Sequence, residues 1–294
     1  MAEHGSSNGI PAQRTAFVMA GGGSLGAVEV GMLQALLDGG ERPTFVVGAS
    51  AGAINAAYFA AEPTRKGAER LERVWCALRR SDVFPLNLRS LIGLLSRRDY
   101  LVEARALRAL LQRHLPYLRL EDAALPVHVV ASDMLSGQEV LLSCGPVIDA
   151  VLASTAIPGV FPPVRLDGRL LVDGGVANNT PISSAIRLGA TRIIVLPTGY
   201  ACALRQIPSG AVARAMHALS LLVSRQLVHD AERYADSGVA LRIVPSLCPL
   251  DTSPYDYSAA SALIAQSRAC TADWIEAGGL HREGIPAQLH EHHH

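Results

Sequence analysis

Three short glycine-containing motifs carry the residue types that could do chemistry in this chain of 294 residues. They read Gly21-Gly22-Gly23-Ser24-Leu25-Gly26, Gly48-Ala49-Ser50-Ala51-Gly52 and Asp173-Gly174-Gly175. A serine hydroxyl becomes a nucleophile once a base removes its proton, and a carboxylate can be that base. Consecutive backbone N–H groups can bind the oxyanion that then forms. Together these groups would suffice for acyl transfer.

The G-x-S-x-G motif at residues 48–52 follows an apolar run at 44–47 and precedes an alanine-rich run at 51–61. This context predicts a strand, a sharp turn at Ser50 and a helix, which is the arrangement that exposes a nucleophilic serine. Gly48 and Gly52 would let the strand and the helix approach closely. The helix N-terminus would favour negative charge near Ser50. An ordinary turn serine is the alternative interpretation of this motif taken alone.

The glycine-rich motif at residues 21–26 follows an apolar run at 15–20 and opens a helical pattern that continues to about Leu37. Consecutive glycines at a helix start can aim several backbone N–H groups at one oxygen. We therefore expect Gly21, Gly22 and Gly23 to form an oxyanion hole, with Gly26 as a supporting position.

The same motif fits G-x-G-x-x-G, which is typical of dinucleotide-binding folds. That interpretation needs an acidic residue at the end of the second strand to hold the ribose. The second strand ends instead at the Ser50 motif, and Asp38 and Glu41 both come before that strand. We therefore favour the oxyanion hole, and we expect no cofactor.

Histidine is the usual base in hydrolases of this class, where it lies on a loop after a strand and comes last in the sequence. His114, His128, His217 and His229 fall within or directly after strand and helix patterns. His281 is the only loose candidate, because it lies near the end of the chain in a glycine-containing stretch.

A carboxylate is a better candidate for the base than any of these histidines. The apolar run at 170–172 predicts a strand that ends at Asp173, and Gly174 and Gly175 then allow a tight turn. A carboxylate held there within hydrogen-bond reach of Ser50 could accept the hydroxyl proton directly. Asp133, which also follows a predicted strand, is the second candidate for the base.

Short apolar runs alternate with helical patterns along the chain, which predicts an α/β fold. We expect a central, mostly parallel sheet flanked by helices in three layers, with the nucleophile turn after the second strand. Further strands are predicted at 127–131 and 192–196, and a long helix at 211–235. One domain at 15–285 would lie between an N-terminal tail (1–14) and a C-terminal tail (286–294) that resembles a tag.

Composition narrows the function further. Hydrophobic residues make up 49% of the chain and charged residues 18%, so a large core is expected. The 26 basic and 26 acidic residues balance, which gives no reason to expect a nucleic-acid partner. Five scattered cysteines indicate reduced thiols, hence a cytoplasmic protein, and argue against a zinc site. Without an acidic cluster, we expect no metal requirement.

Residues 79–119 are strongly basic, with nine arginines against Asp82, Asp99 and Glu103, and leucines are interspersed. One interpretation is an amphipathic surface in peripheral contact with an anionic membrane. The other is an ordinary solvated face above a stripe of core residues, which is what most charge runs are. We favour the second.

The three motifs, in this order, resemble the patatin-like phospholipase family from about Thr15 to at least Leu196. The stretches ASTAIPGVFPPV (153–164) and VDGGVANNTPISSAIRLGA (172–190) resemble it too. The resemblance implies that Ser50 is the nucleophile, that Asp173 completes a dyad with it, and that the triple glycine forms the oxyanion hole. Many members carry an arginine after the triple glycine, where this chain has Ser24 and Leu25. A charge contact between that position and a lipid head group therefore loses its support.

A lipid acyl hydrolase of the phospholipase A or lysophospholipase type is what this resemblance implies, acting on a lipid or another acyl ester. Alternatives are a broad carboxylesterase or an acyltransferase on the same site, and a non-catalytic lipid-binding module. Activity should fall as Asp173 becomes protonated, whereas an acid limb near about 6.5–7 would indicate a histidine base.

Overall fold

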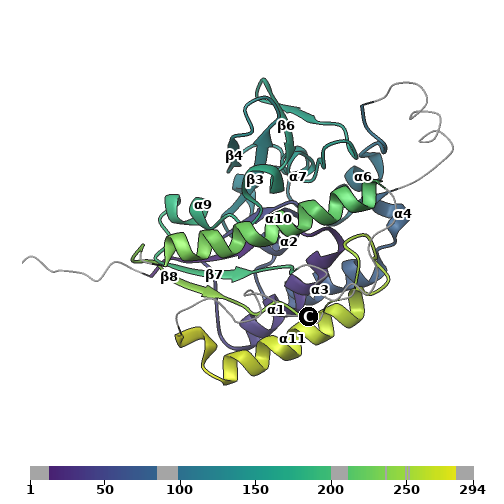
Figure 1. Cartoon of the computed structure of the whole chain (residues 1–294). Helices are drawn as coiled ribbons and strands as arrows, with labels where there is room; N and C mark the ends of the chain where they lie inside the picture. Colours follow the sequence, from purple (N-terminus) through teal and green to yellow (C-terminus); the bar gives the residue numbers. More distant parts are fainter. Residues whose placement is uncertain are drawn as a thin grey trace, which may run out of the picture.

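The computed structural model describes residues 13–84, 99–199, 211–235, 237–248, 250 and 252–282 (Figure 1). Within them the strands are β1 (Thr15–Met19), β2 (Phe45–Ala49), β3 (Val127–Asp133), β4 (Glu139–Leu142), β5 (Val164–Leu166), β6 (Arg169–Asp173), β7 (Arg192–Leu196) and β8 (Ala240–Ile243). The α-helices are α1 (Gly26–Asp38), α2 (Ala51–Ala61), α3 (Arg65–Ala77), α4 (Arg80–Val83), α6 (Arg105–His114), α7 (Val147–Ser154), α8 (Gly175–Asn178), α9 (Ile182–Arg187), α10 (Ala211–Tyr234) and α11 (Ala260–Glu276). Three short 3-10 helices are η1 (Gly23–Leu25), η2 (Leu120–Asp122) and η3 (Gly279–His281).

All of these strands belong to one mixed sheet, with the order β5-β6-β3-β2-β1-β7-β8 and with β4 paired to β3. Strands β1, β2, β3, β7 and β8 pair in parallel. The pairs β3–β4, β3–β6 and β5–β6 are antiparallel. The prediction of a mostly parallel sheet flanked by helices, with a strand-to-helix turn after the second strand, is confirmed.

Side chains of the parallel strands point alternately into two hydrophobic cores. In β1, Phe17 and Met19 belong to one core, and Ala16 and Val18 belong to the other. Helices α1, α2, α3, α6, α7 and α11 cover the first core, while α9 and α10 cover the second. Because successive side chains of a strand face opposite ways, a continuous apolar run is buried on both faces. This is why the fold has three layers.

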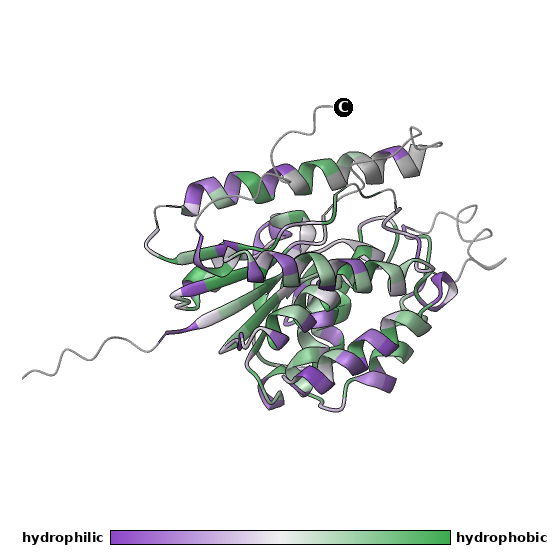
Figure 2. Ribbon diagram, turned by 90° about the horizontal axis from the view of Figure 1, so that it is seen from below, coloured by the Kyte–Doolittle hydropathy of each residue, from purple (hydrophilic) through white to green (hydrophobic). Residues whose placement is uncertain are grey.

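The arrangement of the layers is visible in two views. In Figure 1, α10 crosses above β7 and β8, and α1, α3 and α11 lie below them. Figure 2 shows strands coloured mainly as hydrophobic, surrounded by helices of mixed colour. Among the described residues, no helix is long and apolar enough to cross a membrane.

One edge of β3 is shared by two strands, and this fact positions the candidate site. Val129 and Val130 pair with both β2 and β4, whereas Ala131 and Ser132 pair with both β6 and β4. A strand has only two edges, so β4 occupies one of them, and β2 and β6 occupy the other. Strand β2 runs parallel to β3 and β6 runs antiparallel to it. Their C-terminal ends therefore meet, one residue apart in register, beside Val130 and Ala131.

The predicted elements differ from the observed ones mainly at their ends. The strand expected at 127–131 extends to Asp133, and the helix expected at 211–235 ends at Tyr234. Strands β4, β5 and β8 were not predicted, because they are only four, three and four residues long and largely half-buried. Short strands of this kind lack a clear apolar alternation.

Helices α1 and α11 pack closely against each other at Gly31. A Cβ at Gly31 would lie 2.2 Å from the Ile264 carbonyl oxygen and 2.1 Å from Ser267 Oγ. Only a residue without a side chain lets the two helices approach this closely. Gly39, at the end of α1, has φ −74 and room for a Cβ, with its nearest contact at 3.4 Å.

Gly31→Ala should lower the free energy of unfolding by about 1–3 kcal/mol, because the added methyl group forces the two helix backbones apart. Gly39→Ala is the matched control and should change it by no more than about 0.5 kcal/mol. Urea unfolding followed by circular dichroism measures both. Equal stability of the two variants would contradict the tight α1–α11 contact.

Candidate active site

Ser50 lies at the turn between β2 and α2 in a strained conformation, with φ 51 and ψ −121. A positive φ at a residue other than glycine costs on the order of 1–3 kcal/mol and must be imposed by its surroundings. The Ser50 N–H donates to Ser154 Oγ at 2.9 Å. A Cβ at Gly48 would lie 2.3 Å from the Gly52 carbonyl oxygen, so the motif glycines bring strand and helix together as predicted.

Asp173, at the end of β6, contacts Ser50 directly. Ser50 Oγ donates a hydrogen bond to Asp173 Oδ2 at 2.7 Å, and the Gly175 N–H donates to Asp173 Oδ1 at 2.8 Å. A Cβ at Gly174 would lie 2.1 Å from the Val130 carbonyl oxygen, so the chain can leave β6 only through a glycine. The structure thus brings together Ser50 and Asp173, which the sequence analysis paired.

Burial changes the acidity of Asp173. The side chain is almost completely buried, and loss of hydration raises the pKa of its carboxyl to about 6, although hydrogen bonds from Ser50 and Gly175 act in the opposite direction. The carboxylate is therefore a stronger base than an exposed aspartate while still ionised at neutral pH. An acid limb near 6 is now expected from Asp173 itself, so the position of that limb no longer distinguishes it from a histidine.

The glycine loop, residues 21–23, is held in place through one of its backbone carbonyl oxygens. The carbonyl oxygen of Gly21 accepts hydrogen bonds from Thr198 Oγ1 at 2.8 Å and from Asn179 Nδ2 at 3.1 Å. A Cβ at Gly22 would lie 2.3 Å from Thr198 Oγ1, and Gly23 has φ +59. Two buried side chains thus fix the path of the loop beside Ser50.

Only two of the three predicted oxyanion donors are available. The Gly21 N–H donates to the Asn179 carbonyl oxygen at 3.1 Å, so it serves the fold. The N–H groups of Gly22 and Gly23 have no acceptor among the described residues. The expected contribution of Gly21 is therefore wrong, and Gly22 and Gly23 keep the oxyanion role as a hypothesis.

A segment far along the chain covers this loop. The Ser24 N–H donates to the Pro254 carbonyl oxygen at 2.8 Å, and Ser24 Oγ donates to the Ser253 carbonyl oxygen at 3.1 Å. Nearby, burial and the negative charge of Asp173 raise the pKa of Tyr255 to about 12. The sequence analysis missed this segment, because a Ser-Pro-Tyr loop has no distinguishing pattern. It also missed Ser154, Asn179 and Thr198.

The other candidate bases lie elsewhere. The carboxylate of Asp133 accepts hydrogen bonds from the N–H groups of Leu135 and Ser136, at 3.1 and 2.9 Å, and thus closes its own turn. His281 is exposed in η3 after α11. No histidine in the described ranges forms a hydrogen bond with Ser50 or Asp173.

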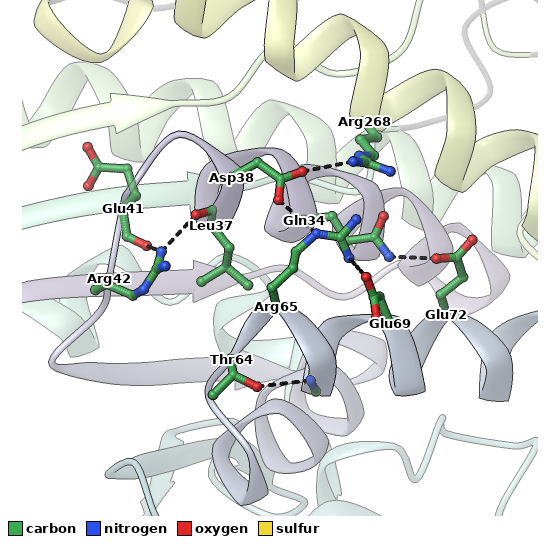
Figure 3. A network of polar contacts seen from close by, with 11 residues as sticks. Gln34, Leu37, Asp38, Glu41, Arg42, Thr64, Arg65, Glu69, Glu72 and Arg268 are labelled. Atoms are coloured by element: carbon green, nitrogen blue, oxygen red, sulfur yellow. Dashed lines mark hydrogen bonds and ion pairs between the residues drawn. The ribbon is translucent and has the colours of Figure 1, made fainter.

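Asp38 and Glu41, the acidic residues nearest the place where a dinucleotide site would need one, form ion pairs with arginines. Figure 3 shows Asp38 between Arg65 and Arg268, at 2.8 and 2.9 Å from their guanidinium nitrogens. Glu41 Oε1 pairs with Arg192 Nη2 at 2.8 Å. Both carboxylates therefore form ion pairs near the end of α1. The described residues also contain no group of three or more His, Cys, Asp or Glu side chains that could hold a metal.

The basic segment at 79–119 is only partly described: Arg89, Arg97 and Arg98, with the leucines at 86–95, lie outside the described residues. Three of its described arginines form ion pairs at 2.8, 2.6 and 2.7 Å: Arg105–Glu103, Arg108–Asp149 and Arg119–Glu121. The apolar face of α6 is turned inward, with Leu107 and Leu111 buried. This part fits the solvated-face interpretation.

Two apolar clefts open beside Ser50. The first, here called the α2 cleft, runs along α2 past Ile54 and Tyr58 and is closed by α3 and by Leu107 of α6. The second, the glycine-loop cleft, is lined by the triple glycine together with Asp173, Val176 and Asn179. The dyad therefore lies where an apolar ester could reach it.

Comparison with known proteins identifies the family of this chain. A family model described as patatin-like phospholipase matches residues 17–186, which is more than half of the chain and includes all three motifs. The chain belongs to the patatin-like phospholipase family. The resemblance found in the sequence is thereby confirmed.

Relatives of this patatin-like chain differ widely in length. An uncharacterized NTE family protein of Mycobacterium tuberculosis is 31% identical over 195 residues, covering 64% of this chain and 50% of that protein. Patatin-like phospholipase domain-containing protein 6 of Homo sapiens is 28% identical over 186 residues, covering 63% of this chain and 13% of that protein. The chain thus spans half or less of the length of these relatives.

Among solved structures, human GIVD cytosolic phospholipase A2 in complex with methyl gamma-linolenyl fluorophosphonate matches 91% of this chain. The match covers 58% of the phospholipase chain, with a TM-score of 0.49 and 13% sequence identity. VipD from Legionella pneumophila matches 90% of this chain and 67% of its own, with a TM-score of 0.44 and 17% identity.

Asp173→Asn should raise stability at neutral pH. The folded-state pKa of about 6 exceeds the ordinary value of 3.8, so the native state binds the proton more tightly, and the free energy of unfolding falls as pH rises between these values. A neutral side chain removes this destabilising effect of the charge, which is on the order of 3 kcal/mol at pH 8. Urea unfolding between pH 4 and 8 measures it, and the gain should vanish at pH 4.

The control for this measurement is Asp133→Asn. Hydrogen bonds from Ser136 lower the pKa of Asp133, so its ionised form stabilises the fold and its replacement should act in the opposite direction at neutral pH. A destabilised Asp173→Asn at pH 8 would show that burial of the Asp173 charge is compensated by contacts that its neutral form lacks.

Thr198→Val should lower kcat about tenfold with little change in KM, because it keeps the side-chain shape but removes a hydrogen bond that holds the glycine loop. Thr271→Val is the matched control, since Thr271 is similarly buried and its hydroxyl has no hydrogen-bond partner among the residues that the structure describes. Steady-state kinetics on one soluble ester measures both. Equal kcat values for the two variants would contradict a role for Thr198 in holding the loop.

Proposed function

We propose that this chain is a serine acyl-ester hydrolase that acts on lipid esters through a Ser50–Asp173 dyad. The observation that carries the proposal is the 2.7 Å hydrogen bond from Ser50 Oγ to a buried carboxylate of raised pKa. Hydrogen-bond contact between a nucleophile and its base is the geometric requirement for general-base activation.

Acylation uses the groups in the order in which they contact one another. Asp173 Oδ2 accepts the Ser50 hydroxyl proton as Oγ attacks the ester carbonyl carbon. The N–H groups of Gly22 and Gly23 stabilise the carbonyl oxygen as it becomes negative. Asp173 then gives the proton to the leaving alcohol, and the acyl group remains on Ser50.

Deacylation reverses these roles with water. Asp173 accepts a proton from a water molecule, whose oxygen attacks the acyl carbon, and the same two N–H groups stabilise the second oxyanion. Collapse of this intermediate releases the carboxylic acid and returns the proton to Ser50 Oγ. The dyad is therefore restored without any other proton carrier.

A lipid is the substrate that the surroundings favour. The α2 cleft is lined mainly by aliphatic and aromatic side chains, which gain free energy when they bury an acyl chain. The glycine-loop cleft is lined by glycines together with apolar residues such as Leu25 and Ile157. The family description and the name of the human relative support the same class of substrate. A broad carboxylesterase that acts on soluble esters is the alternative, and it would use the same dyad without selecting a lipid.

Ser50→Ala and Asp173→Asn should each lower kcat for p-nitrophenyl butyrate and p-nitrophenyl palmitate by at least about 10³-fold, because each removes half of the dyad. The wild-type rate should fall below pH about 6, as Asp173 becomes protonated and no longer accepts the Ser50 proton. Asp133→Asn is the control that should keep its rate. Circular dichroism checks that all three variants are folded.

Three results would contradict the proposal. An Asp173→Asn variant with most of its activity would mean that another group is the base. A serine-reactive phosphonate that labels Ser50→Ala as well as wild type would exclude Ser50 as the nucleophile. Failure of wild type to hydrolyse either ester would favour a binding module on the same fold.

A further inference from the structure

The two clefts beside Ser50 are separate along most of their length and meet at the nucleophile. Among the described lining residues, only Gly23, Ser50 and Ile157 are common to both clefts. An ester bound for attack by Ser50 has two substituents on its carboxyl group, the acyl chain and the alcohol. Two clefts that diverge from one nucleophile can therefore each accept one half of the ester.

The base decides which half enters which cleft. Asp173 lines the glycine-loop cleft and is absent from the described lining of the α2 cleft. In acylation the proton on Asp173 must pass to the leaving alcohol oxygen, and in deacylation the attacking water must contact Asp173. The alcohol oxygen and the water therefore have to approach from the glycine-loop cleft. Because the carbonyl oxygen faces Gly22 and Gly23, the direction left for the acyl carbon chain is the α2 cleft.

On this ground we propose that the α2 cleft binds the acyl chain and the glycine-loop cleft binds the leaving alcohol, with Tyr58 and His114 limiting acyl length. The assignment rests on the proposed hydrolase function and extends it to substrate selection.

The α2 cleft has the shape and chemistry of an acyl site. Ile54 and Tyr58 follow Ser50 by four and eight residues, so they lie on the same side of α2. Leu107 and Leu111 of α6 complete the lining, and no Asp, Glu, Lys or Arg is among its described lining residues. An unbranched hydrocarbon chain could thus leave the Ser50 ester and run along α2 without meeting a charge.

The length of this cleft sets an upper size for the chain. Eight residues of helix separate Ser50 from Tyr58, which is about 12 Å, or roughly nine extended methylene groups. There the Tyr58 and His114 rings lie with their centroids 6.4 Å apart. Both rings line the cleft, so an acyl chain of medium length would reach them and a longer one would have to displace them.

The glycine-loop cleft suits the other half of the ester. Asn179, with a side-chain amide, and the half-exposed Val176 are among its lining residues, and α10 contributes Val223. Exposure of Val176, at 49%, places one side of this cleft at the surface. A polar or bulky alcohol can therefore extend into solvent from this side.

Two ratios of kcat/KM test the roles of the two clefts separately. The acyl ratio compares p-nitrophenyl octanoate with p-nitrophenyl acetate, and the alcohol ratio compares decyl acetate with methyl acetate. Ile54→Trp fills the α2 cleft one turn from Ser50 and should lower the acyl ratio at least about tenfold, with the alcohol ratio within about twofold of wild type. Val176→Trp should lower the alcohol ratio and spare the acyl ratio. Leu118→Trp is the matched control, because Leu118 is 79% exposed and lines neither cleft.

Tyr58→Ala keeps the test decisive if Ile54→Trp does not fold. It removes the ring at the far end of the α2 cleft and should raise the ratio of p-nitrophenyl palmitate to p-nitrophenyl octanoate at least about fivefold.

Three outcomes would overturn the assignment. Ser50-dependent hydrolysis in which Ile54→Trp and Tyr58→Ala leave all acyl ratios unchanged overturns it while the hydrolase function stands. An exchange of the two effects, with Ile54→Trp changing the alcohol ratio, reverses it. Wild type that hydrolyses none of these esters removes the proposed function and the assignment together.

Discussion

The structure around the candidate site depends on one constraint, the meeting of two strand ends along a single edge of β3. Strand β2 reaches this edge in parallel and β6 reaches it antiparallel, and their last residues pair with Val130 and Ala131. Ser50 follows β2 directly, and Asp173 ends β6, so two residues 123 positions apart in sequence come within hydrogen-bond distance. A slip of one residue in either strand would turn its side chains to the opposite face of the sheet.

This meeting point is made by side chains and backbone groups with no chemical role in the reaction. Ser154 Oγ accepts the Ser50 N–H and donates to the Val130 carbonyl oxygen, so one hydroxyl joins the nucleophile turn to β3. Ser132 Oγ donates to the Asp173 carbonyl oxygen and so ties the end of β6 to the same strand. These buried hydrogen bonds satisfy backbone groups that the irregular strand ends leave unpaired. They also hold the strained φ of Ser50 in place.

The sequence predicts the parts of this arrangement that follow from local pattern. Strands β1, β2 and β7 are continuous apolar runs between turn residues, and the glycines of the Ser50 motif indicate a close strand-to-helix turn. Long-range pairing leaves no such pattern. Nothing near Asp133 or Asp173 says which of them β3 and β6 will bring to Ser50, and the choice rested on the Asp-Gly-Gly turn and on resemblance to a family.

Other features of the site could not be predicted from the sequence, because they too depend on contacts between distant residues. Thr198 acts through a hydrogen bond to a backbone carbonyl oxygen 177 residues away, and any hydroxyl residue could look the same in sequence. The oxyanion prediction for Gly21 was wrong because its N–H bonds to the Asn179 carbonyl oxygen, which only the fold reveals. The leucines interspersed among the arginines at 79–119 indicated an apolar surface or a stripe of core residues, yet sequence alone cannot tell a membrane from a cleft as its partner. In α6 the buried leucines face inward. That inward face lines the α2 cleft through Leu107.

The apolar surroundings of the dyad have two consequences that cannot be separated. Removal of water from Asp173 raises the pKa of its carboxyl, which strengthens it as a base. Asp173 also lines the glycine-loop cleft beside apolar residues such as Ile157, so the surroundings that an acyl ester would enter border this carboxylate directly. In a more polar site, water would hydrate Asp173 and lower the pKa of its carboxyl, which would make the carboxylate a weaker base. Such a site would also bind hydrocarbon less tightly. The proposed serine–aspartate dyad, which has no imidazole, would therefore suit a hydrophobic substrate, because binding that substrate would complete the desolvation on which the proposed base depends.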